Sequence, residues 1–549
     1  MENNSKDQLP SDIQEYRNLA TNTVFSFLLN YSSLFFTFIY SFLMARLFKD
    51  DIWGFLIIAT SYIMIIVTIS SLLPPGLNFA LNYYIPHYLV LNEKSKIKSL
   101  IKNSIIIKLV FLVPVFVVSI LVFILFGVIF QISLEDRVSL LYIMSPLIFI
   151  NSLNYILNSI NRGFSRFNYN LLFLIVKNAI HIIPLLLFFL LRISIQVEMV
   201  ALIILISGLV PFILNSLFIF FMIHRIEPSG NEPDSFKSDL SKTVKYGSFI
   251  GLTDLIDRLW KEAQLQGIGF FKSSDIVTGY NISFNYQKIS DYSITSFNLP
   301  LLTSLTTLNA QQNYEQASLV YRIAYKMTLF LLLIISGILF FSVEFTIDFV
   351  FLEDRLIYSN LLKLIVIASI FKVLGLYLQT YLNAQHKVKI SLILKIISMI
   401  FTIPLFFIGL IYLGVEGAII YGLIIGNIIS IVIQIYATYR VANIKLNIKK
   451  IIVQYLTFFT SLVITMLLKE YIFKDASLIL LDRIGLSLIK NFDLLSIISF
   501  LLLFLLMNVL LKTVTSSDII YFESYFQKDR FFDKIITKIL SFLKKFTRN

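Results

Sequence analysis

Five charged side chains lie within nine residues of an otherwise apolar stretch. They are Asp254, Asp257, Arg258, Lys261 and Glu262. A charge at the centre of a membrane-spanning helix costs about 2.5–3.5 kcal/mol, so these side chains are expected to face water or one another. Opposite charges four residues apart can meet along a helix: Asp254 with Arg258, Asp257 with Lys261, and Arg258 with Glu262. The stretch therefore predicts a helix with one charged face and one apolar face.

A second stretch, residues 276–303, carries Lys288 and Asp291 among tyrosines and amides. Two such helices predict the wall of a polar cavity at membrane depth; the alternative is a permanent ion-pair network that only holds helices together. Cations at this depth suit an anionic head group. The candidate substrate-binding residues are Arg258, Lys261, Lys288, Asn78 and Asn82. The candidates for coupling to H⁺ or Na⁺ are Asp254, Asp257, Glu262 and Asp291.

The elements that must position these residues are membrane-spanning helices. The chain is 57% hydrophobic and only 14% charged, and apolar runs of about 20 residues recur along it. We predict an all-α, multi-pass membrane protein with about fourteen spanning helices and both termini in the cytoplasm. The first six are expected at 20–45, 54–88, 103–130, 140–160, 171–191 and 199–223. Eight more are expected at 244–270, 276–303, 325–350, 361–383, 390–412, 417–439, 451–472 and 493–511.

Some of these spans carry polar or helix-breaking residues. Pro74-Pro75-Gly76 must break or kink the second span, just before Asn78 and Asn82. In the fourth span Asn151, Asn154 and Asn158 share a face, and they either line a cavity or bond neighbouring helices. Lys177 and His181 share a face of the fifth span. A packed or hydrogen-bonded histidine is favoured there over a proton carrier.

Basic residues gather on one side of the predicted topology. They cluster around residues 94–102, 162–166, 225–245, 322–326, 387–389 and 440–450. This is the positive-inside pattern, so the net charge of +13 reports orientation rather than a nucleic-acid partner.

Several kinds of chemistry have no sequence signal. The chain contains no cysteine, which excludes disulfides and thiolate metal sites. No phosphate-binding glycine loop or histidine metal motif is present, so we expect no cofactor, no bound metal and no ATP hydrolysis. Acid pairs occur at Glu135-Asp136 and Glu353-Asp354, in short outer loops, and solvated loop ends are the favoured interpretation over a glycosyltransferase metal site.

The two halves of the chain repeat weakly. Basic turns and prolines recur about 214–220 residues apart, and such parallel repeats place a substrate site between lobes that rock. We predict lobes at 1–223 and 244–440, a cytoplasmic linker at 224–243, two additional helices at 441–511 and a cytoplasmic amphipathic tail at 512–549. The tail is expected on the membrane surface, or else packed on loops.

Short motifs up to about residue 440 resemble the polysaccharide-biosynthesis flippases of the multidrug/oligosaccharidyl-lipid/polysaccharide exporter superfamily. They are Ala45-Arg46-Leu47 with Trp53-Gly54, Ile85-Pro86-x-Tyr88, Lys96-Ile-Lys-Ser-Leu100, Arg162-Gly-Phe-Ser-Arg-Phe167, Asp257-Arg258, Gly279-Tyr280-Asn281, Asn383-Ala384 and Gly414-x-x-Gly417-Ala418. The chain departs from the family pattern at Phe48, where glycine is usual, and at Gln385-His386, which replaces a Gly-Lys turn.

The resemblance implies a flippase rather than an enzyme. It implies two six-helix bundles around a cavity, and an ion gradient that drives a polyprenyl- or dolichyl-(pyro)phosphate-linked oligosaccharide across the cytoplasmic membrane. The expected partners are this substrate, membrane lipids and the coupling ion, and the protein is expected to be a monomer. A cation-coupled drug or metabolite exporter of the same superfamily is the first alternative, and a membrane glycosyltransferase or polymerase is the second.

Overall fold

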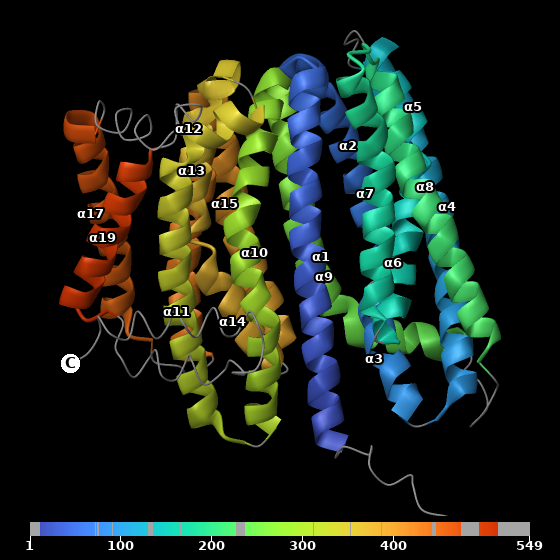
Figure 1. Ribbon diagram of the computed structural model, residues 1–549. Coiled ribbons are helices and arrows are strands. Elements are labelled where there is room, and N and C mark those ends of the chain that lie inside the picture. Colours follow the sequence, from blue (N-terminus) through green and yellow to red (C-terminus); the bar gives the residue numbers. More distant parts are fainter. Residues whose placement is uncertain are drawn as a thin grey trace, which may run out of the picture. The chain divides into compact units, whose positions relative to one another are not determined.

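The computed structural model describes residues 11–129, 135–226, 236–473 and 493–513, apart from residues 72, 74, 75, 91, 165, 311, 352, 386 and 442–445. Every regular element in these residues is a helix (Figure 1). Residues 227–235 of the predicted linker and nearly all of the predicted tail lie outside the described residues.

The chain divides into two compact units between Thr278 and Gly279. The helices of the first unit are α1 (Ser11–Leu47), α2 (Asp50–Ser71), α3 (Leu77–Val90), α4 (Lys94–Ile129), α5 (Glu135–Met144), α6 (Leu147–Gly163), α7 (Phe167–Leu190), α8 (Val197–His224) and α9 (Phe236–Phe271). Contacts assign α9 to this unit, whereas the predicted second lobe begins at residue 244. The reason is that α9 packs against α2, α3 and α4.

The second unit contains most of α10 (Ser274–Ala310), whose first turn belongs to the first unit. It continues with α11 (Tyr314–Phe341), α12 (Val343–Thr346), η1 (Ile347–Phe351), η2 (Glu353–Tyr358), α13 (Ser359–Ser369), α14 (Val373–Ala384), α15 (Val388–Ala418), η3 (Ile419–Ile425), α16 (Gly426–Arg440), α17 (Ile448–Leu468), η4 (Lys469–Phe473) and α19 (Leu494–Leu510).

The described residues contain nine helical stretches that are long and apolar enough to cross a membrane. One of them, residues 388–437, holds two predicted spans, joined at Gly414 where φ is +78°. The chain is a multi-pass membrane protein with an all-α fold, as predicted. Helices occupy all fourteen predicted ranges. The number that cross the membrane and the cytoplasmic location of both termini stay predictions.

Helix starts recur at a nearly constant spacing. Lys94 and Tyr314 begin α4 and α11, 220 residues apart, and Phe167 and Val388 begin α7 and α15, 221 residues apart. This spacing agrees with the internal repeat proposed from the basic turns.

The predicted break in the second span is confirmed. The helix α2 ends at Ser71 and α3 begins at Leu77, and Gly76 between them has φ +79°. Pro74 and Pro75 lie outside the described residues. A positive φ is a conformation that glycine adopts without steric cost, so the backbone at Gly76 does not continue the helix.

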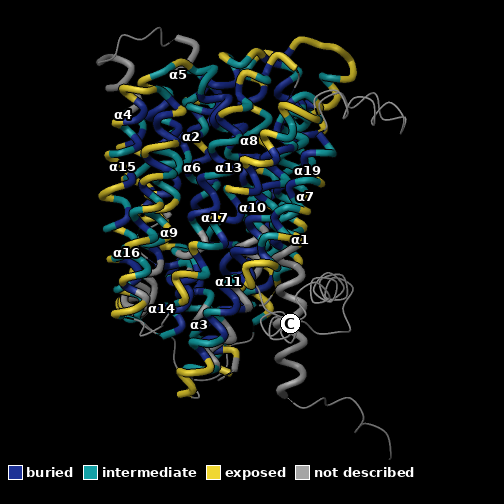
Figure 2. Tube along the Cα trace, turned by 90° about the vertical axis from the view of Figure 1, so that its left-hand side faces the viewer, coloured by how far each residue is buried: buried dark blue, intermediate teal, exposed yellow. Residues whose placement is uncertain are grey.

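The core of the first unit forms around α3. Leu77, Leu81 and Ile85 are buried against apolar side chains of α4, α6 and α8. Gly163 allows close approach of α6 to α3, because a Cβ atom there would lie 2.9 Å from the Ile85 side chain. Exposed apolar side chains instead follow the opposite surface of helices such as α4, at Val110, Val113, Val117 and Leu121. Figure 2 shows this alternation of buried and exposed positions along the helices.

The core of the second unit forms around α11, which is mostly buried (Figure 2). It packs against α13, α14, α17 and α19. Phe500 of α19 lies so close to Gly337 of α11 that any Cβ at Gly337 would collide with its ring. The last two helices are therefore packed as part of this unit.

Candidate functional site

The charged stretch of α9 contains an ion pair that its spacing predicts. Arg258 Nε lies 2.9 Å from Asp254 Oδ2, and the two side chains are 40% and 47% exposed. The guanidinium also lies 5.0 Å from the ring centre of Tyr155 on α6. The Asp254–Arg258 pair is therefore local, half-exposed and braced by an aromatic ring. The pairs Asp257–Lys261 and Arg258–Glu262 stay predictions.

Two side chains fasten α9 to α2. Gln266 Nε2 donates to the backbone oxygen of Ile58 at 2.8 Å, and Ser61 Oγ donates to the backbone oxygen of Glu262 at 3.3 Å. These bonds connect the polar stretch to a neighbouring helix through backbone atoms. The charged side chains thus stand on a helix whose position is fixed within the first unit.

Arg162 is a basic residue near Arg258 that the predicted topology assigns to a cytoplasmic connection. It lies in the last turn of α6, about two helical turns after Tyr155, and its charge interacts with that of Arg258. Two guanidinium groups that repel each other form a favourable place for an anion. Sequence spacing alone could not find this pair, because α6 and α9 are far apart in the chain.

The amides predicted on the second span lie on α3. Asn78 and Asn82 are both half-buried, and the Oδ1 atom of Asn82 is buried without a hydrogen-bond partner among the described residues. The helix α3 packs against α9. Asn82 therefore presents an unused acceptor on a helix that adjoins the charged one.

Asn158 of the fourth span serves to join helices. Its Oδ1 accepts from Asn215 Nδ2 at 3.3 Å, and Asn161 Nδ2 donates to Asn170 and Asn215, both at 3.0 Å. These amides connect α6, α7 and α8. Two roles are predicted as alternatives for Asn158, lining a cavity or bonding neighbouring helices. The structure shows a hydrogen bond to a neighbouring helix.

Asp291 on α10 has a basic partner from another helix. The spacing suggests Lys288, whose Nζ donates to Asn285 Oδ1 at 2.7 Å. Asp291 accepts from Gln287, and its Oδ2 lies 3.6 Å from Lys372 Nζ. Lys372 stands immediately before α14, so the pair joins two helices of the second unit rather than two turns of one helix.

Asp291 and Lys372 lie beside an interruption between α13 and α14, at residues 370–372. The oxygen of Ile370, at the end of α13, accepts from Tyr455 Oη of α17 at 3.1 Å. Ser290 of α10 contacts Ser369 through their hydroxyl groups at 3.5 Å. Interrupted helices are a feature of the ion sites of many transporters.

The Lys177–His181 face of α7 packs against α1. The His181 ring lies 4.6 Å from that of Tyr40, and His181 Nε2 is buried without a partner among the described residues. This is the packed histidine that the sequence favours over a proton carrier.

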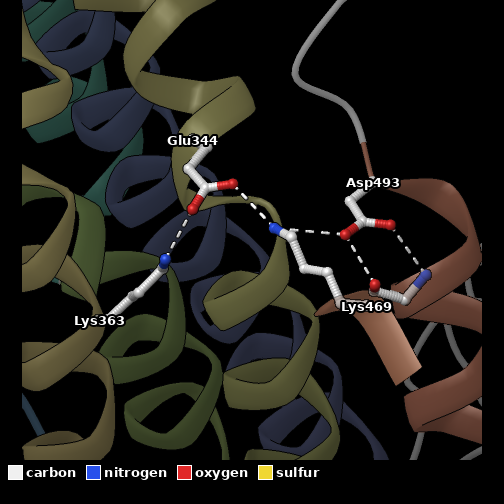
Figure 3. Close-up of polar contacts among 5 residues, drawn as sticks. Glu344, Lys363, Lys469 and Asp493 are labelled. Atoms are coloured by element: carbon white, nitrogen blue, oxygen red, sulfur yellow. Dashed lines mark hydrogen bonds and ion pairs between the residues drawn. The ribbon is translucent and has the colours of Figure 1, made fainter. Parts of the chain in front are cut away.

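A second ion-pair network, for which the sequence offers no signal, joins α12, α13, η4 and the start of α19 (Figure 3). Glu344 accepts from Lys363 at 2.7 Å and from Lys469 at 2.9 Å. Lys469 also pairs with Asp493 at 3.3 Å, while Asp493 caps α19. Glu344 lies in α12, immediately after α11, and its carboxylate is shared between the two lysines.

No group of three or more histidine, aspartate or glutamate side chains in the described residues is placed to hold a metal ion. Glu353 and Asp354 are exposed in η2. The first unit brings together Arg258, Arg162 and the amide acceptor of Asn82. In the second unit, Asp291 lies beside the interruption between α13 and α14.

No protein-family model and no curated protein match the sequence. Solved structures do match it. A multidrug resistance MATE family transporter of the MOP superfamily, inward-facing, aligns with a TM-score of 0.62 and 15% identity, covering 76% of this chain and 98% of that one. The lipid II flippase MurJ, inward closed, aligns with a TM-score of 0.61 and 18% identity, covering 90% of this chain and 98% of that one.

The chain has the fold of the MOP-superfamily transporters. A third match is a superfamily member from Pyrococcus furiosus described by the reversed polarity of its binding pocket, with a TM-score of 0.56, 14% identity and coverage of 76% and 95%. Residues 1–440 are about 80% of the chain. The flippase match at 90% therefore extends beyond α16, toward the two final helices.

Proposed function

We propose that this protein is a membrane transporter, not an enzyme, that flips a lipid-linked oligosaccharide across the cytoplasmic membrane. The lipid carrier would be a polyprenyl or dolichyl chain, linked to the oligosaccharide through a phosphate or diphosphate. The observation that carries the proposal is the length of the flippase match: it covers 90% of the chain, whereas the MATE match covers 76%. Because the flippase match reaches beyond residue 440, it includes part of the additional helices, and this favours a lipid-linked substrate.

The proposed ligands of the anionic head group are guanidinium groups of the first unit. Arg258 is half-exposed, so it is available to a ligand, and Arg162 adds a second positive charge close to it. Guanidinium groups bind phosphate oxygens in bidentate fashion. Lys261 and Lys288 would supply further positive charge, and Asn78 and Asn82 would supply hydrogen bonds to sugar.

The proposed coupling group is Asp291, with Asp254, Asp257 and Glu262 as further candidates. Asp291 and Lys372 join α10 to the interruption between α13 and α14. Binding of H⁺ or Na⁺ to Asp291 would weaken this pair and so link ion occupancy to the position of α14. In the proposed cycle, a monomer with lobes 1–223 and 244–440 alternates access to a site between them.

The test is translocation by the purified protein in liposomes, with a fluorescent disaccharide on polyprenyl diphosphate as the probe. Arg258→Ala should lower the translocation rate by about tenfold or more, because a charged hydrogen bond is worth about 1.5–3 kcal/mol. Arg440→Ala is the matched control, since Arg440 also lies near a tyrosine ring but is exposed at the end of α16. Equal rates for Arg258→Ala and the unmodified protein would exclude Arg258 as a head-group ligand.

The alternative is a cation-coupled drug or metabolite exporter. It is favoured by the MATE match and by the acidic residues Asp254, Asp257, Glu262 and Asp291, which suit a cationic cargo. The same liposomes distinguish the two functions. Uptake of a lipophilic cation such as ethidium, without movement of the lipid-linked disaccharide, would replace the flippase proposal with this one.

A further inference from the structure

The carbonyl groups at the end of α2 lack their usual helical donors because two prolines follow the helix. In a continuous helix the N–H groups of residues 74 and 75 would donate to the oxygens of Ser70 and Ser71. Both residues are proline, which has no N–H group. A carbonyl left without a donor away from water costs about 1–3 kcal/mol. The prolines thus remove the donors that these oxygens would have in a continuous helix, and a donor from elsewhere in the protein can take that place.

Lys108 of α4 supplies that donor. Its side chain is 1% exposed, and its ammonium group donates to the oxygen of Ser70 in a short hydrogen bond and to that of Leu73 at 3.4 Å. The oxygen of Ser70 also receives the N–H of Leu73 at 3.1 Å, in a tight turn. Ser70 Oγ contacts Ser152 Oγ of α6. Side chains of two helices, α4 and α6, thus contact Ser70 near the end of α2.

A lysine suits this position electrostatically. The carbonyl end of a helix carries a partial negative charge, so an ammonium group there is stabilised without a carboxylate. The partners of Lys108 among the described residues are these backbone oxygens. Lys108 lies 14 residues into α4, about 21 Å along its axis, so the contact lies deep in the membrane-spanning part of the helix.

The interruption determines where α3 begins and therefore where its side chains lie. Leu77, Leu81 and Ile85 enter the core of the first unit. The neighbouring positions Asn78 and Asn82 are carried along on a helix that packs against α9. If α2 ran straight through the break, the chain after residue 72 would follow a different direction, and both amides would leave this position.

We propose that Lys108 is a positioning residue: it completes the broken end of α2, and so holds α3 and its two asparagines beside the charged helix α9. Only the expected effect of Lys108 on transport rests on the proposed function; its positioning role does not. Lys108 itself is too buried to touch a head group in this structure.

The first experiment compares three variants by thermal unfolding in detergent and by liposome transport. Lys108→Met should lower the unfolding midpoint and reduce transport by about tenfold or more, since the oxygen of Ser70 loses one of its two donors and the oxygen of Leu73 loses the lysine. Lys108→Arg should retain most of both, because arginine also donates to carbonyl groups. Lys102→Met is the matched control on the exposed side of the same helix, and it should change neither measurement.

The second experiment restores a backbone donor. Pro74→Ala returns an N–H group that can reach the oxygen of Ser70, so Lys108→Met should lower the unfolding midpoint much less in that background. Transport should stay low in the double variant, because the helix is then free to straighten. If Lys108 had only a structural role, stability and transport would recover together in the double variant. An undiminished loss of stability in the Pro74→Ala background would overturn the proposal.

The third experiment measures the position of α3 directly and needs no substrate. Spin labels at Ile69→Cys and Leu89→Cys occupy exposed sites on α2 and α3, and the chain has no other cysteine. Lys108→Met should shift or broaden the label–label distance, and Lys108→Arg should restore it. An unchanged distance in Lys108→Met would refute the positioning role, even if the flippase function holds. If Lys108→Met shifts the label–label distance but the unmodified protein does not move the lipid-linked disaccharide, the positioning role is supported and the proposed substrate is wrong.

Discussion

Two of the predicted spans are interrupted, one in each unit, and different side chains donate to the carbonyl groups at the two interruptions. Between α2 and α3 two prolines and Gly76, with φ +79°, stop the helix, and the ammonium group of Lys108 donates to its last carbonyls. Between α13 and α14 the backbone stays right-handed, with φ −64° and ψ −21° at Ile370. A neutral phenol, Tyr455, donates to the oxygen of Ile370.

The two interruptions differ in how easily the helix could become continuous. We call the one between α2 and α3 the fixed break and the one between α13 and α14 the soft break. Prolines remove donors permanently, so α2 and α3 cannot join into one regular helix. Residues 370–372 have every backbone donor and near-helical dihedral angles, so small rotations would straighten them. We therefore expect the first break to position ligands, and the second, beside Asp291 and Lys372, to move during transport.

The largest expected effect concerns the ion pair at the soft break. Asp291→Asn should remove the response of liposome transport to an imposed H⁺ or Na⁺ gradient, because the amide neither binds a proton at neutral pH nor pairs with Lys372. Glu344→Gln is the matched control, since Glu344 is also a lysine-paired carboxylate of the second unit. If Asp291→Asn still responds to the gradient, coupling depends on other residues and the soft break has no role in it.

The next effect tests whether the first break is fixed by its backbone. Gly76→Ala should destabilise the protein by about 1–2 kcal/mol, the cost of a left-handed conformation for a residue with a Cβ. Gly414→Ala provides the reference, because Gly414 has φ +78° and a Cβ atom added there would meet no other atom within 4 Å. Denaturant unfolding in detergent measures both. A neutral Gly76→Ala would mean that the backbone at the break relaxes easily.

The smallest effect is expected from the phenol at the soft break. Tyr455→Phe should cost about 1 kcal/mol or less, because one neutral hydrogen bond is lost and the ring remains. Tyr436→Phe, at an exposed position of α16, is the control, and thermal unfolding in detergent compares the two. If Tyr455→Phe destabilises the protein as strongly as Lys108→Met, the two breaks depend equally on their donors and the distinction between them fails.

The sequence predicts what local spacing determines. Apolar runs locate the helices, Pro74 and Pro75 indicate the first break, and four-residue spacing predicts the Asp254–Arg258 pair. Each of these depends on residues within one or two helical turns, so no knowledge of tertiary packing is needed.

The sequence does not predict what packing determines. Asp291 pairs with Lys372, which comes from a distant part of the chain. The interruption at residues 370–372 contains no proline or glycine, so it has no local signal. Lys108 is an isolated charge in an apolar run until the carbonyl groups that it bonds are seen on another helix.

The network of Glu344, Lys363, Lys469 and Asp493 bears on the order of biosynthesis. Glu344 and Lys363 are synthesised first and neutralise each other. When α17 follows, Lys469 adds a positive charge that Asp493 balances only after residue 493 has been made. A ribosome-bound chain that stops before α19 therefore presents an uncompensated lysine and leaves Gly337 without the ring of Phe500. The uncompensated charge of Lys469 and the missing ring of Phe500 would therefore distinguish truncated chains from complete ones for proteases that degrade incomplete membrane proteins.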